Sequence, residues 1–194
     1  MSHRQSTSPD PLLDAARASV MAVGVRRTTM SDVARRAQVS RQTAYRRHPD
    51  VGSLLSSLMT REFGRVIEAA ATHAAELGSG RARVVEQTVR GAELLASEPL
   101  FKRILDVDPE LLLPYVVERV GDVQRMVIAG LEEVVERGVA DGSIRAERPR
   151  ILAAAVELIA RGFVLAAHAE REDPFDPWAE LRIALDGYLR PPAS

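Results

Sequence analysis

The sequence contains no cysteine, which excludes disulfide bonds and thiolate metal sites. Its apolar runs fall well short of the roughly 18 residues that a membrane-spanning helix needs. The polar N-terminal stretch MSHRQSTSPDPLL lacks the apolar segment of a secretory signal peptide. We therefore expect a cytoplasmic protein that does not enter a membrane.

Aromatic residues are also scarce, at 4% of the chain, whereas Ala, Val, Leu and Arg are abundant. Strands are typically rich in aromatic and β-branched residues bounded by turns, so this composition predicts an all-α fold. The four histidines are too scattered to predict a metal site. The sequence has no phosphate-binding loop and no nucleophile elbow, so we expect neither a cofactor nor enzymatic activity.

Lysine is almost absent, since Lys102 is the only one, and arginine supplies the other positive charges. The formal net charge of −1 hides an asymmetry along the chain. Residues 1–60 carry nine Arg and four Asp, a net charge of +5, and the remainder carries a net charge of −6. Because the N-terminal part is basic and the rest of the chain is acidic, we predict that the N-terminal part binds a polyanion.

Capping residues, prolines and glycines divide the chain into about nine helices. Asp10-Pro11 begins the first helix and Gly24 ends it, while Pro49 ends the third. The predicted helices cover about 11–23, 30–37, 41–48, 53–77, 81–96, a short segment after Pro99, 109–137, 149–170 and 177–189. Pro114 predicts a kink in the seventh of these helices, or its true start.

The fourth predicted helix is the longest. Leu55, Met59 and Phe63 begin a series of apolar residues at spacings of four and three, which is one face of an α-helix. At 1.5 Å per residue the helix is on the order of 37 Å long, enough to join a head to a separate body. We therefore predict a DNA-binding domain over residues 1–52 and a second domain over residues 53–194.

The second and third predicted helices form a helix-turn-helix. Thr29 caps the first of them by accepting the N–H of Asp32, and Ser40 caps the second. The turn of about three to four residues projects the second helix from the surface. Its first turn carries Arg41 and Gln42, whose side chains can reach bases and phosphates in the major groove.

The residue types on this helix indicate how it contacts DNA. Gln42 can form a two-pronged bond to adenine and Arg46 to guanine. Hydroxyl side chains and the backbone N–H groups beside the caps are suited to phosphates. The predicted DNA-binding residues are Thr29, Ser40, Arg41, Gln42, Thr43, Tyr45, Arg46 and Arg47.

Three segments carry a resemblance to a known family: LLDAARASVMAVGV, TTMSDVARRAQVSRQTAYRRHPD and SLL. In order and spacing they resemble the DNA-binding domain of the TetR (tetracycline-repressor-like) family of bacterial transcriptional regulators. The resemblance implies that Tyr45 contacts a phosphate. It also implies that His48 is a partly buried imidazole packed inside the head, which is favoured over a contact with DNA. The chain departs from the family pattern at Gln38, often Gly in the family, at His48, usually aromatic, and at Val51, usually Lys.

The resemblance also implies a pocket for a small-molecule effector between the linking helix and the helices that follow it. The candidate pocket residues are Phe101, Tyr115, Met126, Glu157, Arg161 and Phe163. For each aromatic residue among them, ordinary core packing is favoured over a role in the pocket. Glu157 and Arg161 are four residues apart, so they can pair, either in a pocket or interface or at the solvent edge of their helix.

One helix-turn-helix reads only a few base pairs, which favours a homodimer. Two heads about 34–36 Å apart, or a multiple of that spacing, would read a palindromic operator in double-stranded DNA. The last two predicted helices are the best interface candidates. The candidate interface residues are Leu152, Val156, Ile159, Leu181, Leu185 and Leu189.

These features together predict a ligand-responsive, homodimeric transcriptional regulator, with repression favoured over activation. A ligand-independent DNA-binding or architectural protein of the same fold is an alternative. A helical enzyme or adaptor, in which the basic head is incidental, is a more distant one.

Overall fold

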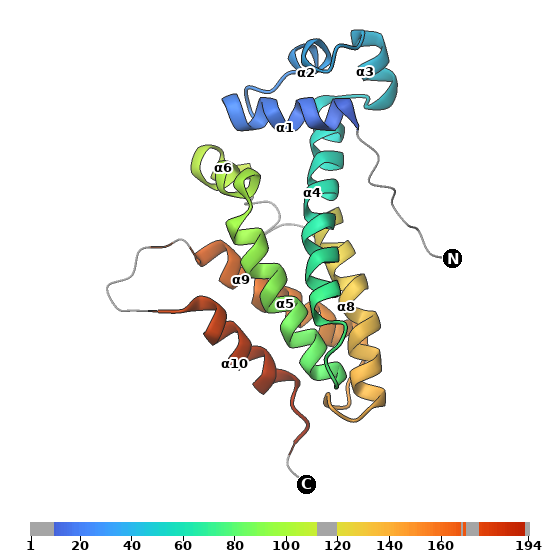
Figure 1. The fold of residues 1–194 in the computed structure, drawn as a ribbon, viewed down its shortest axis with the longest axis vertical. Helices are drawn as coiled ribbons and strands as arrows, with labels where there is room; N and C mark the ends of the chain where they lie inside the picture. The colour runs from blue at the N-terminus through green and yellow to red at the C-terminus, as the bar shows by residue number, and fades with distance from the viewer. Residues whose placement is uncertain (1–9, 112–119, 168, 170–174, 193–194) are drawn as a thin grey trace.

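The computed structural model describes residues 10–111, 120–167, 169 and 175–192 (Figure 1). Within these ranges the fold is all-α, as predicted, with nine α-helices, one 3-10 helix and no strand. The elements are α1 (Pro11–Val23), α2 (Met30–Arg36), α3 (Arg41–Arg47), α4 (Val51–Ala74), α5 (Gly80–Ser97), α6 (Pro99–Val107), η1 (Pro109–Leu111), α8 (Asp122–Ala140), α9 (Pro149–Ala166) and α10 (Pro177–Leu189).

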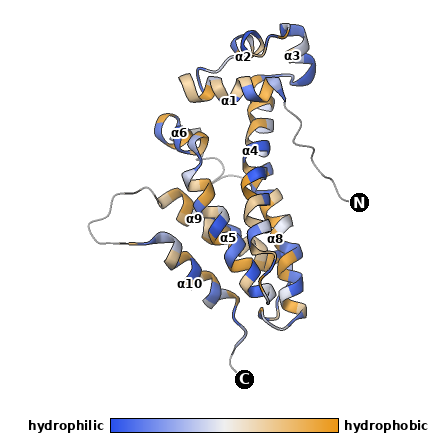
Figure 2. Ribbon diagram, viewed as in Figure 1, coloured by the Kyte–Doolittle hydropathy of each residue, from blue (hydrophilic) through white to orange (hydrophobic). Residues whose placement is uncertain are grey.

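The helices form a small head and a larger body (Figure 1). The head consists of α1, α2 and α3, and α4 descends from it along the body. In the body, α4 packs along α5, α8 packs along α9, and α10 contacts both α5 and α9. In Figure 2, α3 is largely hydrophilic, whereas α9 is mostly apolar. Among the described residues, none of the helices is both long and apolar enough to cross a membrane.

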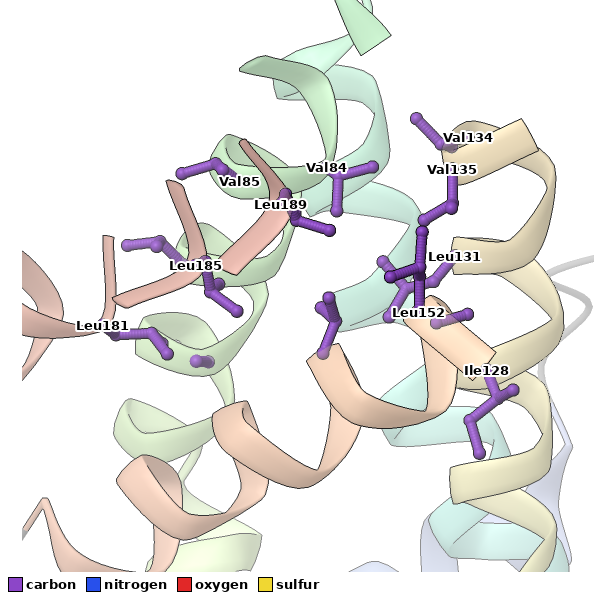
Figure 3. Close-up of a cluster of buried hydrophobic side chains, with 14 of the residues drawn as sticks. Val84, Val85, Ile128, Leu131, Val134, Val135, Leu152, Leu181, Leu185 and Leu189 are labelled. Atoms are coloured by element: carbon purple, nitrogen blue, oxygen red, sulfur yellow. The ribbon is translucent and has the colours of Figure 1, made fainter. Parts of the chain in front are cut away.

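Two buried clusters hold these parts together. The head core contains Leu12, Leu13, Ala15, Ala16, Val20, Met30, Val33, Ala34, Ala44, Leu54, Leu58, Leu100 and Ile104. Since its last four members belong to α4 and α6, the head packs directly on two helices of the body. The body core draws on α5, α8, α9 and α10, and Figure 3 shows its leucine and valine side chains converging from these helices.

Local capping sets the helix starts, with differences from the predicted bounds at α4 and α8. The carboxylate of Asp50 accepts the N–H of Ser53 at 2.7 Å, so α4 begins at Val51, two residues before the predicted start. The seventh predicted helix, from Pro109 to about Arg137 with a kink or its true start at Pro114, differs from the structure, where η1 covers Pro109–Leu111 and α8 starts later. α8 begins at Asp122, because Gly121 has extended backbone and its N–H donates to the Gln124 side chain at 3.0 Å. The kink predicted at Pro114 lies outside the described residues.

Candidate functional site

The turn between α2 and α3 is closed by a residue in the left-handed region. Gln38 has a φ of +56°, and the N–H of Val39 then donates to the Ala34 carbonyl at 3.0 Å. A side chain at this φ costs about 1 kcal/mol relative to glycine. Gln38, one of the departures from the family pattern, therefore adopts a conformation that glycine would adopt without strain.

Both caps of the helix-turn-helix form as the sequence predicted. Ser40 Oγ accepts the N–H of Thr43 at 3.0 Å, and the two hydroxyl oxygens lie 2.9 Å apart. Thr29 Oγ1 accepts the N–H of Asp32 at 3.2 Å and donates to the Asp32 carboxylate at 2.7 Å. This hydroxyl, together with Arg35, holds the pKa of Asp32 below its ordinary value. The hydroxyls therefore fix the geometry of α2 and α3 and leave backbone N–H groups at the helix starts.

The outer face of α3 is polar, exposed and positively charged. Arg41, Gln42, Tyr45 and Arg46 are exposed, whereas Ala44 on the opposite face is fully buried in the head core. In the described part of the chain, neither Arg41 nor Arg46 forms an ion pair, so both charges face solvent uncompensated. This is the arrangement that binding to a phosphate backbone and to base edges requires.

Arg47 differs from its neighbours because it already has a partner. Its guanidinium lies 2.6 Å from the carboxylate of Asp10, the residue that caps α1, and so ties the end of α3 to the start of α1. His48 follows and is half-buried, as expected. Burial lowers the pKa of His48, although the nearby Asp10 carboxylate raises it.

A cavity of about 930 Å³, which we call the body cavity, lies among α4, α5, α6, α8 and α9. One face of α4 forms a long apolar wall made of Leu55, Met59, Phe63, Val66, Ile67 and Ala70. Across it, Phe63 and Phe101 pack edge to face, with ring centroids 6.1 Å apart. Apart from Ile67, these residues belong to the series that the sequence identified as the apolar face of the linking helix, and they form a cavity wall in addition to a packed core.

The body cavity also reaches the head. Val25 and Arg26, in the loop after α1, contribute to its lining. The N–H of Val25 donates to the buried carboxylate of Asp108 at 2.7 Å, and Arg26 lies 2.7 Å from Glu110. Gly24 permits this approach, because its φ is +86° and a Cβ there would lie 2.8 Å from the Asp108 carboxylate. The sequence indicated only that Asp108 starts a helix, and this junction between head and body was missed.

Several polar side chains belong to the otherwise mainly apolar lining of the body cavity. Glu157 is 8% exposed, and its carboxylate lies 3.3 Å from Arg161 Nε. Burial raises the pKa of Glu157, and the Arg161 charge opposes that rise. Thr88 also lines the cavity, and its buried hydroxyl has no hydrogen-bond partner in the described structure. The described residues contain no cluster of three or more His, Asp or Glu side chains that could hold a metal ion.

Comparisons with known proteins agree with this geometry. Residues 12–56 match the model of the bacterial regulatory proteins of the tetR family. Over 191 residues the chain is 34% identical to an uncharacterized HTH-type transcriptional regulator of Mycobacterium bovis, covering 97% of this chain and 98% of the relative. The chain belongs to the TetR family of transcriptional regulators.

Solved structures place this TetR-family regulator among proteins of the same fold. The transcriptional repressor QsdR of R. erythropolis has a TM-score of 0.70 at 19% identity, covering 92% of each chain. FadR of Bacillus subtilis, solved in complex with stearoyl-CoA, has a TM-score of 0.65 at 15% identity, covering 93% of this chain and 98% of the other. At these identities the likeness shows the fold alone.

The sequence-predicted pocket residues of this TetR-family regulator are divided among several environments. Phe101, Glu157 and Arg161 line the body cavity, together with many α4 residues that were not named for it. Met126 and Phe163 are half-buried and lie outside the lining. Tyr115 lies outside the described residues. Helical phase alone could not indicate which apolar residues border a void and which pack against each other.

The residues predicted for a dimer interface need correction. Leu152, Val156, Leu181, Leu185 and Leu189 are all 0% exposed and belong to the body core of the same chain, and Ile159 is half-buried beside them. Figure 3 shows the four leucines among the core side chains of α5 and α8. Side chains enclosed by their own chain cannot meet a second one. The exposed apolar residues of α9 and α10 are Ile151, Leu158 and Ile183.

Proposed function

We propose that this TetR-family regulator binds a palindromic operator as a homodimer and releases it when a small molecule occupies the body cavity. Residues 1–52 would bind DNA, and residues 53–194 would bind the effector and form the dimer. The observation that carries the proposal is that one continuous cavity is lined both by α4 and by the Val25–Arg26 loop of the head. An occupant of that cavity contacts both parts of the molecule.

In this proposal α3 lies in the major groove. Arg41, Gln42 and Arg46 contact base edges, because they are exposed on its outer face and carry the donors that guanine and adenine accept. Thr43, Tyr45, Arg47 and the N–H groups beside Thr29 and Ser40 contact phosphates. Arg47 additionally holds α3 against α1 through Asp10, so it positions the helix as well as binding DNA.

A second copy of the chain would pack on the outer faces of α9 and α10. Leu158 is 60% exposed and Ile183 is 64% exposed, and Ile151 on α9 is 40% exposed. These side chains would gain the burial that one chain alone does not provide. A two-fold axis through this face would present two α3 helices to successive major grooves of one duplex face.

Release of DNA follows if the effector prefers one head orientation. A ligand shifts an equilibrium only by its difference in affinity between two states. The junction of Val25 with Asp108 offers such a difference, since a ligand that displaces the loop weakens the head's attachment to α6. Two proteins of the same fold support this, because QsdR is a transcriptional repressor and FadR was solved in complex with stearoyl-CoA.

The main alternative is a ligand-independent DNA-binding protein of this fold. A cavity of about 930 Å³ favours the ligand-responsive form, because small-molecule sites usually measure about 300–1,000 Å³. The proposed role is non-catalytic and located in the cytoplasm, where the operator DNA is found.

Selection of bound sequences from random duplex DNA tests the DNA-binding part of the proposal. A palindrome with half-sites one or more helical turns apart is the expected result, and bound DNA without a shared sequence would contradict it. Sedimentation of the selected complex should give two chains per duplex. A single chain per site would contradict the dimer.

Paired variants then test α3. Arg41→Ala/Arg46→Ala should weaken operator binding. The slope of log K against log salt concentration should become shallower by about 2 if both side chains neutralise phosphates, and by less if they contact bases. Arg137→Ala/Arg148→Ala removes two exposed arginines of the body and should leave both quantities unchanged. Equal effects of the two double variants would mean that α3 is not the recognition helix.

A further inference from the structure

The charges that line the body cavity balance one another. Six ionisable side chains belong to its described lining, and they form three ion pairs. Arg26 lies 2.7 Å from Glu110, Arg125 lies 2.5 Å from Asp122, and Arg161 lies 3.3 Å from Glu157. The described lining therefore has no net formal charge and offers an incoming ion no uncompensated counter-charge.

The inner pair differs from the other two in its environment. The side chains of Arg26, Glu110, Asp122 and Arg125 are each at least 44% exposed, so water screens them. The side chains of Glu157 and Arg161 are only 10% and 20% exposed. A charged ligand group at this depth would disrupt the contact between these two side chains in a poorly hydrated site, which is costly.

Neutral hydrogen-bonding groups also line the body cavity. Gln87, Thr88 and Gln124 line the same cavity, and the hydroxyl of Thr88 is buried without a hydrogen-bond partner in the described structure. These side chains can bind a hydroxyl or carbonyl group without a change in the charge of the site. The rest of the lining is mainly apolar.

The shape of the cavity completes the argument. Its apolar wall extends along α4 from Leu55 to Ala70, which at 1.5 Å per residue is roughly 22 Å. We propose that the effector is an elongated, mainly apolar and electrically neutral molecule with one or two hydrogen-bonding groups, of the class of a long-chain alcohol, ketone or ester. This inference rests on the proposed ligand response and adds the chemical class of the ligand.

Three probes with the same twelve-carbon chain test the charge requirement: 1-dodecanol below its solubility limit, and dodecanoate and dodecyltrimethylammonium below their critical micelle concentrations. Binding is measured by calorimetry on the whole chain, and release of operator DNA by fluorescence anisotropy. We expect dodecanol to bind at least about tenfold more tightly than either ion, because only the ions disturb the inner pair.

Charge variants of the inner pair sharpen the test. Glu157→Gln leaves the cavity lining with a net positive charge, so the affinity for dodecanoate should rise about tenfold relative to dodecanol. Arg161→Gln leaves a net negative charge and should favour dodecyltrimethylammonium in the same way. Unchanged affinities of the two ions relative to dodecanol in both variants would show that this pair does not discriminate against charged ligands, and would overturn the assignment.

A glycine on α8 allows the cavity to be filled. Gly130 lines the cavity, and a Cβ added there meets no atom within 4 Å. Gly130→Leu should abolish dodecanol binding and leave DNA binding intact. Gly64→Leu on α4 is the matched control, because Gly64 is equally uncrowded and lies outside the lining, so dodecanol binding should persist.

The outcomes separate this inference from the proposed function. Tighter binding of either ion than of dodecanol overturns the neutral class and leaves the ligand response standing. Dodecanol binding that survives Gly130→Leu places the site elsewhere and overturns the inference. Binding in the cavity without release of DNA supports the ligand class but contradicts the proposed regulation. No binding of any probe overturns the inferred ligand class and leaves the proposed operator binding, which the sequence selection tests separately.

Discussion

The head and the body of this regulator are stabilised in different ways. In the head, α2 and α3 have only seven residues each, below the length at which isolated helices are stable. They depend on the caps Thr29 and Ser40 and on the head core. In the body, α4, α5, α8 and α9 have 18 to 24 residues each, yet they enclose a cavity of about 930 Å³.

This difference connects stability with function. Short capped helices present α3 in one fixed orientation, as a surface that reads DNA requires. Long helices that enclose a void keep part of their apolar surface unpacked, so a ligand can gain contacts that the empty protein lacks. The Asp108–Val25 contact joins the two regions. Changes placed in the body, at this junction and in the head should therefore give distinguishable effects.

The largest effect should come from the closest helix contact of the body. A Cβ added at Gly80 on α5 would collide with the backbone of Gly138 on α8, which cannot move without displacing a whole helix. Gly80→Ala should lower the free energy of unfolding by about 3 kcal/mol. Gly78→Ala is the control, because a Cβ there meets nothing within 4 Å, and it should change stability by less than about 0.5 kcal/mol. Chemical denaturation measures both, and equal values would disprove the close packing.

A smaller effect is expected at the junction. Asp108→Ala removes the buried acceptor of the Val25 N–H and should cost about 2 kcal/mol, with faster amide hydrogen exchange at Val25. Asp106→Ala on the exposed side of α6 should change neither quantity. If exchange at Val25 is the same in both variants, the head does not depend on this contact.

In the head, the turn residue gives a stabilising prediction. Gln38→Gly should raise the free energy of unfolding by about 0.5–1 kcal/mol, because glycine adopts a φ of +56° without strain. Gln42→Gly, in the interior of exposed α3, should lower it by about 1 kcal/mol. Thermal unfolding of both variants measures the difference, and a loss of stability in Gln38→Gly would mean that the side chain has a stabilising role.

The features that the sequence predicted well are determined by neighbouring residues. The caps at Asp10, Thr29 and Ser40 and the stop at Gly24 depend only on nearby backbone, so the bounds of α1, α2 and α3 follow to within a residue or so. The exposed face of α3 follows in the same way, because Ala44 faces the head core.

The features that the sequence failed to predict depend on tertiary packing. α9 is apolar on two sides, and its pattern cannot decide that Leu152 faces its own chain while Leu158 faces solvent. Glu157 and Arg161 were recognised as a pair, but only the placement of α4 and α5 makes them line a cavity. Asp108 was recognised as a cap, and its contact with Val25, 83 positions away, leaves no local signal.

The smallest predicted effect is a pH dependence confined to the head. Burial lowers the pKa of His48 in the folded protein below the ordinary value of 6.5, so the unfolded chain binds the proton more readily. The resulting stabilisation is present above about pH 6.5 and is lost as the pH falls through the lowered pKa. His48→Asn removes the imidazole and with it this pH-dependent stabilisation. Asp10 and Arg47, whose charges also act on the imidazole, remain in the variant. Amide hydrogen exchange in α3, measured between about pH 8 and pH 5, reports the local stability of the head. The wild type should lose stability as the pH falls, and His48→Asn should lose less. Identical losses in both proteins would mean that other groups cause the pH dependence.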